Sequence, residues 1–400
     1  MMLVNRLLSA SVTGLVAVVI GFASSAALIY QTVITLGGDV SLAASWILTL
    51  GLSMGLTSIG LSLFYRVPIL IAWSTPGAAL LITIGQGFTL NEAIAGFIFS
   101  ALLIFLSGIT GWFEKLSNKI PFPLASAMLA GILVNFGIDV FNQMNNEPLL
   151  VVAMFVTFLI AKQIMPKYAM LLLLLSSIVM AWQLELVALS ELSLQVSEFK
   201  YISPEFNIKA LLGIGIPLFI VTMAAQNLPG IAVLQAHNYK TPVSSILSVT
   251  GLVNVLTAPF GGYAINLAAI TAAMCMTEEV DKDPGQRYWS AVFAGGFYML
   301  MAISAAYLMA VFSALPSALI YALAGIALFT TITSSIEQAL SDKKMSEAAI
   351  ITFLVTASDI SLWGGSSVLW GLIAGCTTLV SQNSFGKIQN RKALKKKRPD

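Results

Sequence analysis

Two apolar stretches interrupted by proline and glycine set the architecture of this chain: Pro68-Ile-Leu-Ile-Ala-Trp-Ser-Thr-Pro-Gly-Ala78 and Pro259-Phe-Gly-Gly-Tyr-Ala-Ile-Asn-Leu-Ala-Ala269. Their first prolines are 191 residues apart in a chain of 400, so they occupy corresponding places in its two halves. Proline and glycine break the helical pattern inside each stretch. A matched pair of interrupted apolar segments is typical of membrane proteins built from inverted repeats, above all secondary transporters.

Each stretch changes its pattern midway. Residues 68–73 are short, β-branched and aromatic, which favours an extended strand. Thr75 followed by Pro76 is typical of a helix cap with proline at the first helical position. In the second stretch residues 261–263 suit an extended chain, and Asn266 suits a cap before the next helix. We therefore predict two spans that are half strand and half helix, with helix N-termini converging near the membrane midplane; ordinary kinked helices are the alternative.

The composition excludes whole classes of protein. Hydrophobic residues make up 58% of the chain, charged residues only 10%, and the mean hydropathy is +0.90. A soluble enzyme, a disordered protein and a secreted disulfide scaffold are therefore excluded. Cys275 and Cys376 are isolated, so neither a disulfide nor a metal site is expected. A single histidine and no phosphate-binding glycine loop argue against a hydrolase and against direct use of ATP.

The charged residues divide the chain into about 14 apolar spans, seven in each half. We predict an all-α polytopic membrane protein with a 7+7 inverted repeat. With both termini in the cytoplasm, 18 of the 20 lysines and arginines fall on the cytoplasmic side, and only Lys200 and Lys209 fall outside. The basic tail, residues 387–400, is interpreted as a topology anchor beside the membrane and not as a nucleic-acid contact.

Two motifs carry a family resemblance. Residues 73–78 (Trp-Ser-Thr-Pro-Gly-Ala) and residues 225–230 (Ala-Gln-Asn-Leu-Pro-Gly) resemble signatures of the BenE family of benzoate/proton symporters. That family is similar in fold to nucleobase transporters of the uracil/proton symporter type. The resemblance implies a core domain, a gate domain and a tail, with these boundaries: core 1–118 and 207–314, gate 119–206 and 315–386, tail 387–400.

The resemblance also implies a function. We expect a transporter in the bacterial inner membrane that imports benzoate or a related aromatic carboxylate with protons, as the core moves against the gate. It implies no cofactor besides the coupling proton, and a homodimer through the gate domain. Nucleobase transporters place glutamates in spans eight and ten, where this chain has Gln226, Asn227 and Ile265. The loss of these carboxylates suits an anionic cargo, while a neutral heterocycle as cargo and a passive anion channel stay as alternatives.

Few polar groups lie within the spans, so the candidate substrate-binding residues are few. Each has a structural alternative: helix capping, bonding to broken backbone, or packing. The candidates are Phe22, Ser25, Ser74, Thr75, Pro76, Gln226, Asn227, Tyr263 and Asn266.

Proton coupling has three candidate residues. Asp139 and Asp359 are the acids nearest to the membrane interior, and His237, the only histidine, follows span eight. A histidine at a helix end is more often a capping or solvated residue. Transport of the neutral acid, which carries its own proton, is the alternative to any relay.

Overall fold

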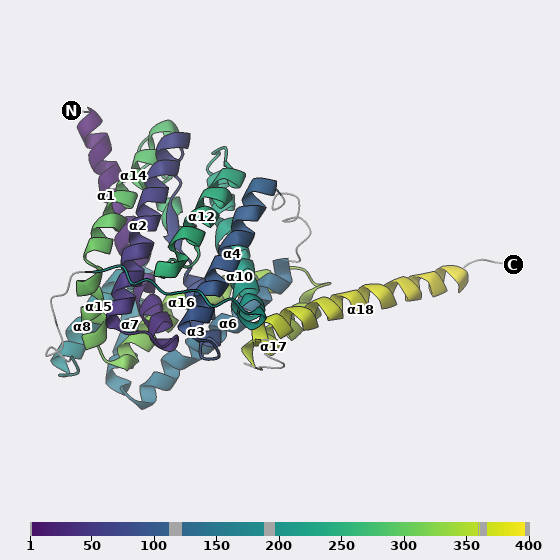
Figure 1. Cartoon of the computed structure of the whole chain (residues 1–400). Coiled ribbons are helices and arrows are strands. Elements are labelled where there is room, and N and C mark those ends of the chain that lie inside the picture. The colour runs from purple at the N-terminus through teal and green to yellow at the C-terminus, as the bar shows by residue number, and fades with distance from the viewer. Residues whose placement is uncertain (1, 112–121, 188–196, 359, 361–365, 397–400) are drawn as a thin grey trace.

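The chain folds into a bundle of long apolar helices, seen in a computed structural model (Figure 1). The structure describes residues 2–111, 122–187, 197–358, 360 and 366–396. The elements of the first half are α1 (Met2–Thr35), α2 (Val40–Tyr65), β1 (Ile71–Trp73), α3 (Thr75–Gly85), α4 (Leu90–Thr110), α6 (Phe122–Asn142), α7 (Pro148–Ile164) and α8 (Ala169–Gln183). Those of the second half are α9 (Ile208–Ala210), α10 (Ile216–Thr222), α11 (Leu228–Ala236), α12 (Val243–Thr257), β2 (Ile265–Leu267), α13 (Ile270–Met274), α14 (Tyr288–Ile303), α15 (Ala305–Ala314), α16 (Ser317–Ala339), α17 (Ser346–Ala357) and α18 (Ser367–Lys396).

Within the described part of the chain, eight helices are long and apolar enough to cross a membrane. A further span is the pair α14 and α15, which bends by 62° at Ser304. Four shorter apolar helices are α3, α7, α17 and the first part of α18. The segment of β2 and α13 lies between α12 and α14, where the sequence predicts the tenth span. The chain is a multi-pass membrane protein.

The helix packing follows the inverted repeat. Helix α2 packs along α14, and α4 packs along α12, as Figure 1 shows. These two pairs join spans two and eleven and spans four and nine, so each pair is the image of the other under exchange of the halves. A second group of contacts joins α6 to α16 and α17, and α17 to α18.

The two interrupted stretches meet as strands. β1 and β2 pair antiparallel, with Ala72 opposite Asn266 and Trp73 opposite Ile265. The predicted half-strand, half-helix spans are therefore confirmed, since β1 leads into α3 and β2 into α13. Non-helical backbone inside a membrane needs hydrogen-bond partners, and the pairing of β1 with β2 supplies some of them.

Neighbouring spans supply the bonds that the short strands lack. The hydroxyl of Ser62 in α2 donates to the carbonyl of Ile69 and accepts from its amide. In the second half the side chain of Asn254 in α12 donates to Ile265 O at 2.9 Å and accepts from Ile265 N at 2.8 Å. A polar side chain from the second span of each half thus completes the broken span of that half.

Span eight is also irregular. It contains two π-helical turns, η4 (Leu211–Gly215) and η5 (Met223–Asn227). Pro217 and Pro229 follow these turns, and each lacks the N–H that a regular helix requires. The wide turns accommodate the prolines and re-aim the residues on them. Gln226 and Asn227 both lie on η5.

Candidate substrate site

The N-terminus of α3 is capped by Ser74. Its hydroxyl accepts a hydrogen bond from Gly77 N at 2.9 Å, and its backbone is extended. The prediction of Thr75 as the cap is wrong by one residue, because Thr75 opens the helix and Pro76 follows it. Ser74 takes the role because its own amide donates to Ala264 O at 3.0 Å, which keeps it in line with the strands. Ser74 is buried, while Thr75 is half-buried.

Asn266 is not a helix cap. It lies in β2, fully buried, and its amide nitrogen donates to Ala264 O at 2.7 Å. α13 starts at Ile270, with Ala269 at the cap position and no side-chain cap bond. The cap prediction is wrong because Asn266 belongs to the strand pair that joins the two halves. Its side-chain oxygen has no partner in the described structure, which is costly for a buried amide.

Ser25 and Phe22 of α1 hold Trp73 of β1. The indole N–H of Trp73 donates to Ser25 Oγ at 2.7 Å. The ring of Phe22 lies 5.9 Å from the ring of Trp73 and 6.5 Å from that of Phe312 in α15. Ser25 therefore acts on the broken span through Trp73, and the three rings form an aromatic cluster immediately before the N-terminus of α3.

The two amides of span eight behave differently. Asn227 is fully buried, and its oxygen accepts from Leu267 N at 3.2 Å, so it supports β2. Bonding to broken backbone was one of its two predicted roles. Gln226 is half-buried, so its side chain is partly accessible. The π turn separates the two amides in this way.

Tyr263 is a packing residue in this structure. It is fully buried, with its ring 6.1 Å from Trp46 and 5.9 Å from Phe97. Its hydroxyl donates to Ser74 O at 3.4 Å. The space around the Tyr263 ring is thus filled by Trp46 and Phe97 and not by a ligand. Through its hydroxyl, Tyr263 also supports Ser74, the cap of α3.

The three proton-coupling candidates fall in different settings. Asp139 of α6 lines a cavity of about 660 Å³ and accepts from Asn142 Nδ2 at 3.2 Å. Asp359 lies outside the described residues. His237 is half-buried at the end of α11, where Nδ1 lies 2.9 Å from Val233 O. A carbonyl only accepts, so Nδ1 carries the proton and His237 caps the helix end.

Sequence reasoning missed several buried polar residues, of which three brace the strands and one, in the first span, is unpaired among the described residues. Ser58 Oγ accepts from Ile71 N at 2.9 Å, and Asn254 and Ser62 brace the strands as described. Gln31 of α1 is 6% exposed, and neither of its amide atoms has a partner in the described structure. The available signal was a polar side chain in the middle of an apolar span, which needs a partner there.

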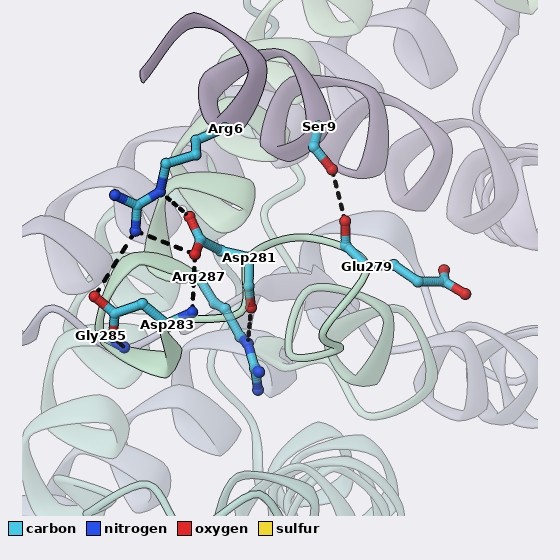
Figure 2. Close-up of polar contacts among 7 residues, drawn as sticks. All are labelled: Arg6, Ser9, Glu279, Asp281, Asp283, Gly285 and Arg287. Carbon is cyan, nitrogen blue, oxygen red and sulfur yellow. Dashed lines mark hydrogen bonds and ion pairs between the residues drawn. The ribbon is translucent and has the colours of Figure 1, made fainter. Parts of the chain in front are cut away.

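The end of the tenth span that is predicted to face the cytoplasm is hydrogen-bonded to α1 (Figure 2). The Arg6 guanidinium forms two hydrogen bonds to the Asp281 carboxylate, and Ser9 donates to Glu279 O at 2.7 Å. Arg287 is buried, and its guanidinium donates to Asp281 O and Met276 O, both at 2.7 Å. The hydrogen bond from Arg6 holds the pKa of Asp281 below its usual value. The loop that follows α13 is therefore held in one place.

Comparisons with known proteins find relatives over nearly the whole chain. Residues 5–380 match the family model described as benzoate membrane transport protein, BenE. The chain is 44% identical to the inner membrane protein YdcO of Escherichia coli over 370 residues, 92% of this chain and 95% of that one. It is 36% identical to the benzoate membrane transport protein of Acinetobacter baylyi over 368 residues, 92% of this chain and 93% of that one.

Two solved structures share the fold at low identity. The transmembrane domain of the cyanobacterial bicarbonate transporter BicA aligns with a TM-score of 0.62 and 15% identity, over 92% of this chain and 97% of that one. SLC26A9 aligns with a TM-score of 0.62 and 12% identity, over 94% of this chain and 65% of that one. At this identity the likeness concerns the fold alone.

Two inverted halves, broken spans paired at the centre and a capped half-helix define the class as a membrane transporter and not an enzyme. The chain belongs to the BenE family of benzoate membrane transport proteins.

Proposed function

We propose that this protein imports benzoate or a related aromatic carboxylate across the bacterial inner membrane by proton symport. The observation that carries the proposal is the capped N-terminus of α3 beside the cluster of Phe22, Trp73 and Phe312. Family membership and the descriptions of the two relatives support the cargo and the membrane. Aromatic rings next to a helix N-terminus suit a ligand with one ring and one carboxylate.

The carboxylate would lie at the start of α3. The dipole of the eleven-residue helix α3 favours an anion at its first turn. Thr75, half-buried on that turn, offers a hydroxyl, and Gln226 offers a neutral amide. Because these groups are neutral, they donate to an anion without repelling it. Ser74 and Asn227 are engaged with the backbone and act as positioning residues.

The helix packing supports a division into two moving parts. We propose that α1–α4 and α9–α15 form the core, that α6–α8 and α16–α18 form the gate, and that the gate also carries a dimer contact. Both termini would face the cytoplasm. The 660 Å³ cavity then opens outward between Ile82–Phe88 of the core and Asp139 of the gate. On the opposite side Lys167 and Glu279 form an ion pair at 3.3 Å that joins gate to core.

Asp139 is the proposed proton acceptor. It is the acid among the described residues that line the cavity, so protons and cargo can reach it from the same side. An ionised Asp139 would repel an incoming carboxylate, whereas a protonated one would not. Cargo and proton would therefore enter together. His237 is the weaker candidate, because its ring already caps α11.

The test is uptake of labelled benzoate into proteoliposomes, with and without an inward proton gradient. We expect accumulation above the external concentration that collapses with a protonophore. Asp139→Asn is expected to exchange benzoate but to lose accumulation, and Glu147→Gln, an acid at the same end of the gate, is the matched control. Uptake that only equilibrates would replace symport by a passive pathway, and no uptake would withdraw the cargo.

A further inference from the structure

The cavity between α3 and α6 has a chemistry of its own. Among the described residues that line it, Lys209 is the cation, Asp139 is the anion, and Phe88, Phe136 and Tyr321 supply aromatic rings. Its volume of about 660 Å³ falls within the 300–1,000 Å³ usual for small-molecule sites. The central residues Ser74, Thr75 and Gln226 are not part of its lining. It is therefore separate from the capped N-terminus of α3.

Lys209 is free to take an anion. Its ammonium donates one hydrogen bond to Gly87 O at 2.7 Å, which leaves two of its three protons. It takes part in none of the ion pairs within the described structure. Its acidic neighbour Glu92 is already engaged, since its two oxygens accept from Asn207 and from the amide of Thr89. The charge on Lys209 is thus held in position but not neutralised by a direct contact.

Phe88 is held beside that ammonium. Lys209 Nζ lies 4.8 Å from the centre of the Phe88 ring, and the ring packs where Gly213 has no side chain. A Cβ at Gly213 would meet the ring at 2.5 Å. The aromatic ring and the cation therefore form one unit, with the cation fixed by the end of α3 and the ring fixed by span eight.

We propose that this cavity is an outer capture site for aromatic monocarboxylates, in which Lys209 holds the carboxylate and Phe88 with its aromatic neighbours holds the ring. The inference rests on the proposed function and orientation for its role in import. A lysine in a concave, partly enclosed mouth raises the local concentration of anions and speeds their arrival. The captured molecule would then pass to the N-terminus of α3 when Asp139 is neutral.

The first experiment measures equilibrium binding of labelled benzoate to the purified full-length protein. Wild type is expected to show a second, weaker site that disappears in Lys209→Gln and persists in Lys209→Arg. Lys200→Gln is the matched control, because Lys200 is the other lysine predicted outside and is bonded to Ser41 and paired with Asp39. A single site in wild type, or two sites in Lys209→Gln, would overturn the proposal whether or not the protein transports benzoate.

The second experiment measures the sidedness of transport. In right-side-out vesicles Lys209→Gln is expected to raise the KM of influx about three- to tenfold with kcat unchanged, as loss of one charge-assisted contact near a surface implies. The KM of efflux should stay at the wild-type value. Phe88→Ala should reduce the preference of influx for benzoate over cyclohexanecarboxylate. An equal rise in influx and efflux KM would overturn capture at the outer face. Failure of wild type to transport would instead remove the proposed function.

Discussion

The indole N–H of Trp73 donates to the hydroxyl oxygen of Ser25 at 2.7 Å, and this bond ties the first span to the first broken span. The second half contains a counterpart, in which Asn227 of span eight accepts from Leu267 N at 3.2 Å. In each half the first span thus holds the strand of the third. The pair of β1 and β2 is positioned from both sides by spans of the same halves.

The bond between Ser25 and Trp73 should be measurable by a double-mutant cycle. Ser25→Ala leaves a buried N–H without a partner, which costs about 1–3 kcal/mol. We expect a lower Tm of the purified protein and slower benzoate uptake. In a Trp73→Phe background the same change should have little further effect, because the donor is gone. Equal effects in both backgrounds would contradict the coupling.

Gly230 should not tolerate a side chain. A Cβ there would meet Leu267 Cβ at 2.6 Å, so Gly230→Ala must push α11 away from β2. We expect loss of most transport activity, because α11 continues the helix that carries Gln226. The control is Gly60→Ala, since a Cβ at Gly60 has nothing within 4 Å. That change should leave uptake intact, and comparable losses in both variants would refute the steric argument.

A carboxylate at position 226 should discriminate between cargoes. Gln226→Glu places a negative charge beside the proposed anion site, and we expect benzoate uptake to fall at least about tenfold, as like-charge repulsion in a partly buried site implies. Gln235→Glu, on the exposed end of the same span, should have little effect. Uptake of uracil by Gln226→Glu would support the alternative of a neutral heterocycle as cargo. Undiminished benzoate uptake would remove Gln226 from the proposed site.

The ion pair between Lys167 and Glu279 is expected to matter for conformation and not for stability. Its side chains are 57% and 77% exposed, so it contributes at most about 1 kcal/mol. Lys167→Cys with Glu279→Cys should be cross-linked by a flexible bis-methanethiosulfonate reagent that spans the length of the two replaced side chains, and this should stop transport until a reductant cleaves the link. Each single cysteine variant is the control. Transport that continues at full rate through the cross-link would show that core and gate do not separate there.

Acid should release the tie between Arg6 and Asp281. The hydrogen bond from Arg6 lowers the pKa of Asp281, so the folded state favours the ionised carboxylate. The resulting stabilisation is present above the unfolded pKa of about 3.9 and is lost as pH falls through the lower folded value. Tm of wild type should exceed that of Asp281→Asn at pH 7, and the gap should close below about pH 4. A gap that stays constant down to pH 3 would show that the charge is not involved.

Local chemistry made much of the fold predictable. Apolar runs between charges define the spans because a helix that crosses lipid must satisfy its own backbone. The breaks at Pro68, Pro76 and Pro259 follow from the missing N–H and the fixed backbone angle of proline. The matched positions of the two breaks indicate an inverted repeat without any knowledge of the contacts between them.

Local chemistry misplaced the residues whose partners are distant in the chain. Asn266 is a good cap by composition, yet strand pairing with Ala72 places it inside β2. Ser74, and not Thr75, caps α3, because a backbone bond to Ala264 aligns it with the strands. Tyr263 packs against Trp46 from span two, a neighbour that spacing along the chain does not indicate.

The sequence by itself determined that the chain is a membrane protein, how its spans are divided, and where two of them break, because hydropathy, charge and proline act on the residue that carries them. Only the tertiary structure decided which polar groups are consumed in holding the broken spans and which stay open. Asn227 accepts a hydrogen bond from Leu267 of β2, and among the described residues its neighbour Gln226 makes no bond to β2. The two differ because the π turn η5 directs only Asn227 toward that strand. Lys209 became a candidate anion site only when folding placed Phe88 and the cavity beside it.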